Sequence, residues 1–453
     1  MSVRLVVCWL LLGSLLVPLV GRAAAAGPER LDLATCIARA LKAAPVLAEA
    51  QAEVAEGQAR LSEAKVSRFL PEASVTTVAG AAPQARGTVQ HSLDSTTTRS
   101  LGPFTRVEVS FVQPLFTGGK IVAGIAAATH AVEQSLASRD AKAGEIVEQV
   151  TTLYYNVLLA RSVGSVLDEA SDAFATALKT AQERRDHGDP KVTEVDLLNL
   201  RIAAAEVAKD IPRLAAGEAD ALEALRRLIG AQPTDPIDLQ QHILDPEAGA
   251  VKPLADYEQM LFERNTDWRQ VTAGLAAKQE EAKTVEADFY PTVFLEGSFA
   301  YAYAPERDRQ RNPFAYDDFN YLHGPGAVLG IRWLLNFHVT AARAATKRAE
   351  VAHLEAAQRS ARSGLPVELH HAYRHVQETE QAMARLNDGR RAGRALLTAT
   401  VANFDLGIGD AKEILDGLGN YARVSSDHLE AVRDYNVARA ALARVTGTAN
   451  TLP

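Results

Sequence analysis

Hydrophobic residues recur along this chain with two different periods, and each period predicts its own kind of element. Long stretches repeat apolar residues every three or four positions, as in VEQVTTLYYNVLL at 147–159, which predicts amphipathic helices. Shorter stretches alternate: in VEVSFVQ at 107–113, the side chains of Val107, Val109 and Phe111 share one face and the polar ones lie opposite. This alternation predicts β-strands with one apolar face.

Four stretches have the strand pattern, and the loops that join them in pairs are polar. The strands are expected at about 72–82, 104–115, 291–304 and 326–337, with loops at 83–103 and 305–325 that are rich in Ser, Thr, Pro, Asn and charge. Each strand is about as long as one that crosses a bilayer at a tilt. One apolar and one polar face fit the wall of a membrane barrel, and they equally fit a soluble hairpin packed on a core.

Three aromatic residues in the second strand pair are candidate anchors at the membrane interface. Tyr301 and Tyr303 lie in TVFLEGSFAYAY at 292–303, and Trp333 lies in the strand that follows. In the membrane interpretation they sit at the level of the lipid headgroups. In the soluble interpretation they are ordinary packing residues.

A long helical pattern follows each strand pair and is itself followed by a returning helix. The long helices are expected at about 119–187 and 338–406, with returns at about 192–229 and 411–446. At 1.5 Å per residue each long helix runs about 100 Å, far beyond a globular helix. Pro212 interrupts the first return, and Gly364 and Pro366 interrupt the second long helix, so bends or restarts are expected there.

The chain contains an internal repeat with an offset of about 219 residues. This offset places Leu115 and Phe116 on Leu334 and Leu335, Tyr154 on Tyr373, and Gly188 on Gly407. The first repeat is expected to span 27–240, with its helical tip near 186–191, and the second 241–453, with its tip near 405–410. The Pro-rich segment QPTDPIDL at 232–239 links them. Such self-similarity indicates one structural unit used twice.

The N-terminus and the charge balance bear on the location of the protein. Residues 1–26 combine a basic start, an apolar run and Ala-x-Ala sequences, which predicts a signal peptide and export; a membrane anchor is the alternative. Without them, 46 basic and 56 acidic side chains leave about −10, which argues against a nucleic acid partner. Only Cys36 then remains, so no disulfide forms within the chain. No later stretch has the roughly 18 apolar residues of a spanning helix, so the membrane interpretation requires strands.

Closure of the sheet sets the expected assembly. Four strands cannot close a useful barrel, since small closed barrels have about eight, and unpaired strand edges cannot face lipid. If the strands lie in a membrane, copies of the chain must share one barrel. Three copies, which supply twelve strands, are the smallest cyclic solution with a lumen.

The order helix, strand, loop, strand, long helix, turn and helix, given twice, resembles the TolC-like outer-membrane efflux protein family over about residues 31–447. The segments that carry the resemblance are FLP at 69–71, QPLFTGG at 113–119, RRDHGDPKVTEVDLL at 184–198, RRLIG at 226–230, FYP at 289–291, FDLGIGDAKEILD at 404–416 and ARVTG at 443–447. The resemblance implies a mostly α-helical trimer with a twelve-stranded outer-membrane barrel and a long periplasmic α-helical barrel. It also implies the outer membrane of a Gram-negative bacterium as the location.

The resemblance further implies a function and partners. Such proteins are the exit ducts of tripartite efflux pumps or of type I secretion, and they dock through their helical tips onto a periplasmic adaptor that links them to an inner-membrane transporter. The expected adaptor-contacting tip residues are Gly188, Asp189, Gly407, Gly409 and Asp410. The alternative is a periplasmic structural coiled-coil protein without a pore.

Acids behind the second tip are the candidate periplasmic gate. In the family, acids a short way along the last returning helix form a constriction ring, and the positions that match are Glu413 and Asp416. Helix capping explains Asp410 and partly Glu413, but Asp416 lies beyond the first turn, where the dipole effect fades. The spacing of three puts Glu413 and Asp416 on one face, so a threefold axis would gather six carboxylates.

Two departures from the family pattern affect this transfer of residues. The second repeat has NFHV at 336–339 where the first has TGGK, so this strand-to-helix junction lacks its glycines. In the first tip, Asp196 follows Gly188 by eight residues rather than six, so the first tip cannot be matched residue by residue.

No catalytic constellation appears in the sequence, and no enzymatic activity or cofactor is expected. His370, His371 and His375 include a pair at i and i+4 that is suited to a metal, but no third ligand lies nearby, so a polar helix surface is expected. A phosphate-binding loop and a zinc-protease motif are both missing, so the energy for transport must come from a partner.

Overall fold

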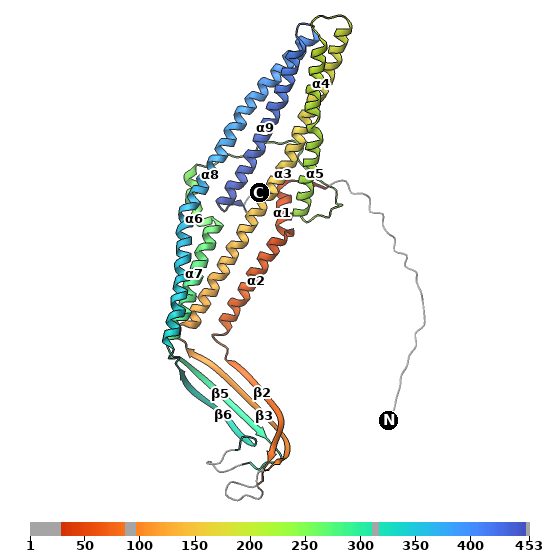
Figure 1. Cartoon of the computed structure of the whole chain (residues 1–453). Helices are drawn as coiled ribbons and strands as arrows, with labels where there is room; N and C mark the ends of the chain where they lie inside the picture. Colours follow the sequence, from red (N-terminus) through yellow and green to blue (C-terminus); the bar gives the residue numbers. More distant parts are fainter. Residues whose placement is uncertain (1–28, 87–96, 310–316, 450–453) are drawn as a thin grey trace, which may run out of the picture.

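The computed structural model describes residues 29–86, 97–309 and 317–449. The signal peptide expected at 1–26 and the central parts of both polar loops lie outside these ranges. The described chain is elongated: long helices fill one part, and a twisted sheet continues from one end of them (Figure 1). Among the described residues, no helix has both the length and the apolar character that crossing a bilayer requires.

Two very long helices span the helical part, and each is followed by its return. The long helices are α3 (Lys120–Asp186) and α8 (Phe337–Asp405), and the returns are α4 (Glu194–Ala208), α5 (Asp210–Leu228) and α9 (Ala411–Val445). Shorter helices extend the bundle toward the sheet: α1 (Leu33–Ala43), α2 (Pro45–Val66), α6 (Leu254–Arg264), α7 (Thr266–Glu286) and the short η1 (Ala287–Phe289). Together the described elements form a mostly helical chain, as predicted.

The two helix interruptions expected at prolines have different outcomes. The returning helix of the first hairpin is divided in two: α4 ends at Ala208, and α5 begins at Asp210. Pro212 therefore lies in the first turn of α5, where backbone amides have no partner within the helix and a proline removes no hydrogen bond. In contrast, α8 runs without a break through Pro366. The flanking Leu365 and Leu369 are buried in a cluster with residues of α6 and α9, and this packing maintains the helix across the proline.

Four antiparallel strands form one sheet in the order β2-β3-β5-β6. Their bounds are Glu72–Gln84, Thr97–Phe116, Thr292–Tyr303 and Tyr321–Arg332. The last strand thus begins and ends about five residues before the range predicted from its sequence. The reason lies in the chain after Arg332, where LLNF leads directly into α8 instead of continuing the ladder.

The strand register places the two predicted apolar faces on the same side of the sheet. Val109 lies opposite Val75 on one side and Phe299 on the other, which joins both repeats in one apolar row. The next row is polar: Ser110 lies between Ser74 and Ser298, and the Oγ atoms of Ser74 and Ser110 are 2.8 Å apart. The sheet therefore has one largely apolar face, and most of its polar side chains lie on the other face.

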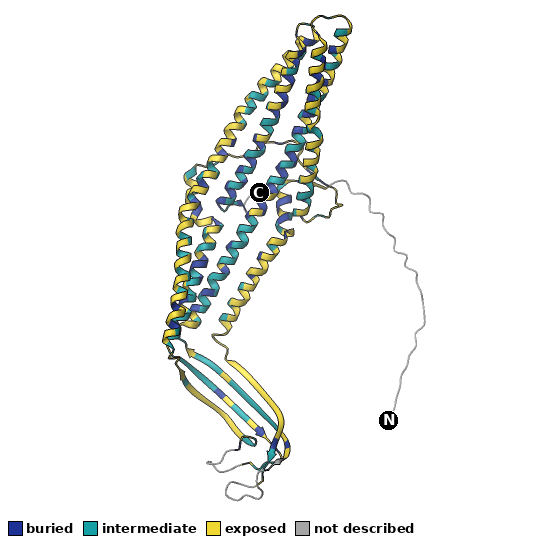
Figure 2. Ribbon diagram, viewed as in Figure 1, coloured by how far each residue is buried: buried dark blue, intermediate teal, exposed yellow. Residues whose placement is uncertain are grey.

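The hydrophobic core lies in the helical part and around the short parallel pair of β1 (Glu29–Leu31) and β4 (Ile237–Leu239). Tyr154 and Leu158 of α3 are fully buried there with Leu225 of α5. Figure 2 shows buried residues along the inner sides of the helices, whereas the edge strands β2 and β6 are exposed over most of their length. Within one chain, the sheet therefore has no core of its own.

The two strand-to-helix junctions are built differently, as the missing glycines suggested. In the first, Gly118 and Gly119 have positive φ angles, and Gly119 is the N-cap of α3. In the second, aromatic packing replaces the glycine turn. The indole Nε1 of Trp333 donates to the carbonyl of Phe289, and the Trp333 ring meets that of Phe337 at 6.0 Å.

Gly447 closes the end of α9 against the turn between α6 and α7, and we expect it to tolerate no side chain. Its φ is +69°, and an added Cβ would lie 2.1 Å from the carbonyl oxygen of Arg264. Gly447→Ala should therefore destabilise the protein by more than the roughly 1–2 kcal/mol that a left-handed conformation alone costs an L-residue. The measurement is the midpoint temperature at which helical circular dichroism is lost. Gly164→Ala, in the interior of α3 with open space around it, is the matched control and should not lower that midpoint; equal midpoints for both variants would contradict the expectation.

Candidate functional site

The two helical tips end α3 and α8 with the same backbone geometry. At each tip a glycine has a left-handed φ, +83° at Gly188 and +75° at Gly407. The amides at 187, 188 and 189 donate to the carbonyls of 183, 185 and 184, and the amides at 406, 407 and 408 donate to those of 402, 404 and 403. Every pair is related by 219 residues, which supports the predicted repeat. The pattern is the usual glycine-terminated helix end.

The returning helices are offset by 217 residues instead, so the two tips differ by two residues. Thr193 is the N-cap of α4, and Asp410 is the N-cap of α9, as predicted for Asp410. The first tip therefore has two additional residues between its glycine and its N-cap. This explains why Asp196 follows its glycine by eight residues and Glu413 by six: both are the third residue after the N-cap. The mismatch that prevented the transfer lies in the turn, not in the helix.

The carboxylates of Asp196 and Glu413 have the same helical position but different surroundings. Asp196 closes a capping box, because its Oδ2 accepts bonds from the backbone amide and the hydroxyl of Thr193 at 2.9 and 2.7 Å. At the second tip the N-cap is an acid, and the Oδ1 atom of Asp410 accepts from the Glu413 amide at 2.9 Å. An ionised N-cap has no proton to donate to Glu413. Within the described part of the chain, the carboxylate of Glu413 has no ion-pair partner.

Asp416 lies one turn beyond Glu413, and both side chains are exposed. They point away from the face of α9 that buries Ile414 and Leu418 against the other tip. Asp416 lines a groove between α4 and α9 whose other side carries Asp196 and further polar residues of α4. Among the residues that the structure describes, the second tip thus presents two exposed carboxylates without an ion-pair partner, whereas the acid at the corresponding position of the first tip is bound locally.

Arg184 joins the two tips, and the sequence patterns alone do not indicate this role. Arg184, at the end of α3, donates from Nη1 to the carbonyl of Phe404 at 3.0 Å, and its guanidinium lies 4.6 Å from the centre of the Phe404 ring. It also pairs with Asp189 at 2.6 Å. The signal that could have found it is the RR pair before Gly188, which has no counterpart before Gly407.

Asp189 stabilises this contact over a wide pH range. The backbone amide of Lys191, then the guanidinium of Arg184, hold the pKa of the Asp189 carboxyl below its usual range. A lowered pKa in the folded state means that the stabilisation is present above the ordinary carboxyl pKa near 3.8 and is lost as the pH falls through the folded value. Lys191 adds a second link, because its Nζ donates to the carbonyl of Gly407 at 3.1 Å.

Gly409 differs from the other tip glycines, because its φ is not in the left-handed region. Its amide donates to the carbonyl of Asn403 at 3.0 Å, and an added Cβ would lie 3.2 Å from the Asn403 Cβ and 3.1 Å from the Glu413 Oε2. The glycine therefore permits a close approach of the chain to the end of α8, and Gly407 alone supplies the positive φ.

The three candidate interface aromatics are exposed and lie at opposite ends of the sheet. Tyr301 and Tyr303, at the loop end of β5, stack with ring centres 6.4 Å apart. Trp333 follows the last residue of β6, at the end near the helices.

Two of the three candidate histidines of α8, His370 and His375, have carboxylate partners. The His370 Nε2 is 2.7 Å from Glu258, and the His375 Nδ1 is 3.6 Å from Glu378. In the ranges that the structure describes, no group of three or more His, Cys, Asp or Glu side chains is arranged to hold a metal.

Removal of the Arg184 link should loosen the second tip. Hydrogen bonds to charged groups contribute about 1.5–3 kcal/mol, so Arg184→Gln should speed amide exchange at residues 406–409 about tenfold or more, since 1.4 kcal/mol is a factor of ten. Hydrogen exchange followed by mass spectrometry measures this rate. The control is Arg185→Gln, because Arg185 pairs with Glu194 on the surface of its own hairpin. If the two variants exchange alike, the link does not hold the tip.

Comparisons with known proteins agree with these observations. The family model for outer membrane efflux proteins matches residues 36–231. Protein CyaE of Bordetella pertussis is 25% identical over 272 residues, which are 59% of this chain and only 52%, about half, of that relative. The outer-membrane channel OprN has a TM-score of 0.75 at 17% identity, over 92% of this chain and 90% of that one. The Campylobacter jejuni CmeC outer membrane channel has a TM-score of 0.73 at 13% identity, over 92% and 86%.

At these identities the solved structures establish the fold, and the family model adds the evidence of sequence. The fold is that of channel proteins rather than of enzymes. Over residues 36–231 the chain is similar in sequence to the outer membrane efflux proteins, and over nearly its whole length it has the fold of outer-membrane channels; both findings agree with the resemblance to the TolC-like outer-membrane efflux protein family and with the outer-membrane location that its sequence predicted.

Proposed function

We propose that this protein is the exit duct of an export system, either a tripartite efflux pump or type I secretion. It carries substrates outward from the periplasm or cytoplasm together with an inner-membrane transporter and a periplasmic adaptor. The observation that carries the proposal is the direct connection of a sheet with one apolar face to the 67-residue helix α3 and the 69-residue helix α8. At 1.5 Å per residue each helix extends about 100 Å, which suits a conduit across the periplasm.

The edges of the sheet support assembly from three copies. β2 and β6 are its outer strands, and the apolar side chains of Val75 in β2 and Ile331 in β6 are 69% and 72% exposed. In lipid, open edges would leave backbone groups without partners. Three copies supply twelve strands, and pairing of β6 with β2 of the next copy would satisfy both edges. The two predicted repeats then each contribute one hairpin to the barrel and one to the helical conduit.

The aromatic residues fit the two boundaries of a membrane-embedded band. Tyr301 and Tyr303 would mark the outer interface, and Trp333 the periplasmic interface. The polar loops then face the exterior, and the helices occupy the periplasm.

The helical tips are the proposed contact with the adaptor. Besides Gly188, Asp189, Gly407, Gly409 and Asp410, they expose two large apolar side chains, Leu406 and Ile408, which are 73% and 67% exposed. Exposed apolar residues at the far end of a long hairpin suit a partner that covers them. The links from Arg184 and Lys191 to the second tip keep both turns in one surface.

Glu413 and Asp416 are the proposed periplasmic gate. Their carboxylates are exposed and share one face of α9, and Glu413 lacks the local bonds that occupy Asp196. When that face lines a threefold axis, six carboxylates attract cations and repel anions. The alternative, a periplasmic structural coiled-coil protein without a pore, assigns no function to these two acids. It predicts no stepwise current across a membrane.

Removal of the gate carboxylates should widen the passage and weaken its charge selection. The double variant Glu413→Ala with Asp416→Ala is expected to raise the single-channel conductance in planar bilayers and to move the reversal potential in a salt gradient toward the value for no selectivity. The control is Glu430→Ala, which removes an exposed acid from α9 well away from the tip.

Two outcomes would count against these proposals, and they are distinct. Unchanged conductance and reversal potential in the double variant would remove the gate but leave the channel. If neither the native protein nor the double variant gave stepwise current, the channel itself would be wrong.

A further inference from the structure

The segment that follows β5 does not lead straight into β6 but crosses the sheet to its opposite edge. Arg307 forms a parallel bridge with Ala85, just beyond β2. The Ala85 amide donates to the carbonyl of Glu306, and the Asp308 amide donates to the carbonyl of Ala85, both at 3.1 Å. Because β3 lies between β2 and β5, this segment must pass over β3 to make the bridge. We call residues 304–309 and 317–320 the crossing segment.

The crossing segment passes over the polar face of the sheet. Side chains alternate along β3, so Gly102 and Phe104 share the face of Arg106 and Glu108. A Cβ added at Gly102 would lie 2.9 Å from the Cβ of Glu306. Phe104 meets the ring of Phe319 edge-on at 5.2 Å.

Two further residues of the polar face are buried at the same end of the sheet. Ala82 lies opposite Gly102 and Ala302 lies opposite Arg106, so both share the polar face. They are 1% and 0% exposed, and Ala82 lies on the edge strand β2, whose preceding residues are exposed. The described parts of the loop therefore bury the polar face at this end of the sheet.

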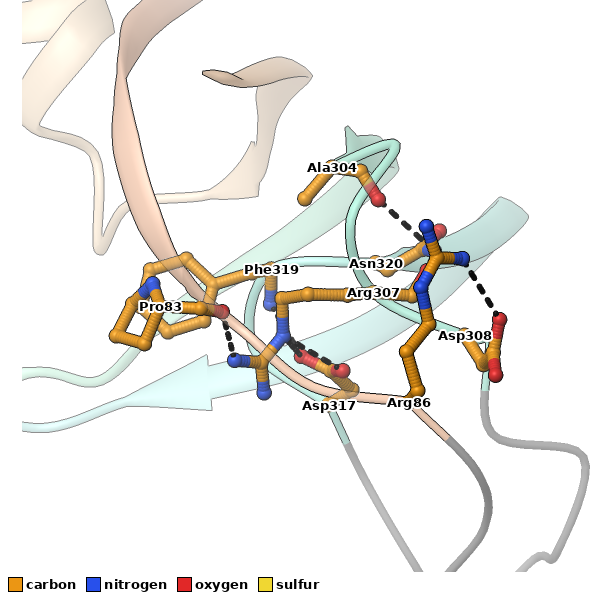
Figure 3. A network of polar contacts seen from close by, with 8 residues as sticks. All are labelled: Pro83, Arg86, Ala304, Arg307, Asp308, Asp317, Phe319 and Asn320. Carbon is orange, nitrogen blue, oxygen red and sulfur yellow. Dashed lines mark hydrogen bonds and ion pairs between the residues drawn. The ribbon is translucent and has the colours of Figure 1, made fainter. Parts of the chain in front are cut away.

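Arg307 fastens the crossing segment in place (Figure 3). Its Nε donates to both carboxylate oxygens of Asp317, at 3.1 and 3.0 Å, and its Nη1 donates to the carbonyl of Pro83 at 2.7 Å. The guanidinium lies 5.1 Å from the centre of the Phe319 ring. Asp317 is only 6% exposed, so this pair is sheltered from solvent. The clasp formed by Arg307 and Asp317 thus joins the loops of the two strand pairs.

Two further ion pairs of Arg86, which are more exposed, reinforce the clasp. Arg86 lies 3.2 Å from Glu306 and 3.3 Å from Asp308. Asn320 donates to the carbonyls of Ala304 and Arg307 and so closes the turn of the loop. Acidic and basic groups are nearly balanced within the network, and most are paired, so it offers little net charge to a passing solute.

We propose that the crossing segment is a constriction at the outer mouth of the channel that selects solutes by size. This inference rests on the proposed function: if twelve strands close with their polar faces inward, a segment on the polar face lies inside the lumen. Three such segments, one from each copy, would narrow the exit. The channel then has two filters in series, a charge filter of acids at the periplasmic tip and a size filter at the outer mouth.

The test releases the clasp and measures the size limit from the loop side. Arg307→Ala combined with Asp317→Asn removes the ion pair without leaving a buried charge alone. Polyethylene glycols of graded size are added only on the loop side of a planar bilayer, because polymers that enter the outer mouth lower the current. We expect the limiting size to shift to larger polymers and the reversal potential in a salt gradient to stay unchanged, since Glu413 and Asp416 are untouched.

The matched control is Arg309→Ala, which removes the same charge from an exposed position of the same loop. Its size limit should equal that of the native protein. A double variant that assembles normally and keeps the native size limit would overturn the constriction. Absence of stepwise current from the native protein and from the gate variant would instead contradict the proposed function.

A second variant tests the constriction without loss of the clasp. Gly102→Cys with Glu306→Cys puts two thiols where the Cβ atoms lie within 2.9 Å, closer than the roughly 3.8 Å of a relaxed disulfide, so oxidation needs a small backbone shift. Oxidised channels should have the native size limit, and reduction should shift it to larger polymers, because the unlinked side chains crowd and displace the segment. A limit that is the same before and after reduction, with the disulfide verified on a gel, would refute the proposal.

Discussion

The unpaired edges of the four-stranded sheet are the constraint on which the rest of this structure depends. β2 and β6 each present backbone donors and acceptors along a whole strand, and an apolar face continues across all four strands between them. A soluble protein would cover that face, but the described helices lie beyond the end of the sheet (Figure 1). The proposed pairing of edges between copies would satisfy the backbone groups, turn the apolar face to lipid and enclose the polar face. The helical conduit, the tips and the crossing segment take their proposed roles from this closure.

The two helical hairpins have the same architecture, but the carboxylates at their tips have different partners. In the first hairpin, Asp196 is bound in a capping box and Asp189 pairs with Arg184, so both carboxylates of this tip have partners within the same hairpin. In the second, the carboxylates of Glu413 and Asp416 have no ion-pair partner among the described residues, and Arg184 and Lys191 of the first hairpin donate hydrogen bonds to the backbone of this tip. The first hairpin therefore supplies the support and the second the charged surface.

Much of the fold could be predicted from periodicity and order, because long amphipathic helices and alternating strands leave clear patterns. The failures have local causes. Pro366 predicts a bend or a restart, and α8 does not restart there, because packing around Leu365 and Leu369 keeps the helix continuous. The last strand was placed too late, since LLNF is apolar enough to extend a strand although the chain there already turns toward α8. The correspondence of Asp196 with Glu413 depends on the N-caps. The bonds of Arg184 to Phe404 and of Arg307 to Pro83 join residues more than 200 positions apart, which no single-sequence pattern reveals.

The most direct test of the central claim is a disulfide between β2 and β6. Within one chain these strands are three strand spacings apart, about 14 Å, whereas a disulfide requires Cα atoms within about 7 Å. Val75→Cys in β2 can be combined in turn with single cysteines along β6, such as Leu329→Cys, which faces the same side. The account predicts reducible covalent dimers and trimers from membranes for the pair in register. Only monomers for every pair, under oxidation that completes an engineered control disulfide, would contradict it.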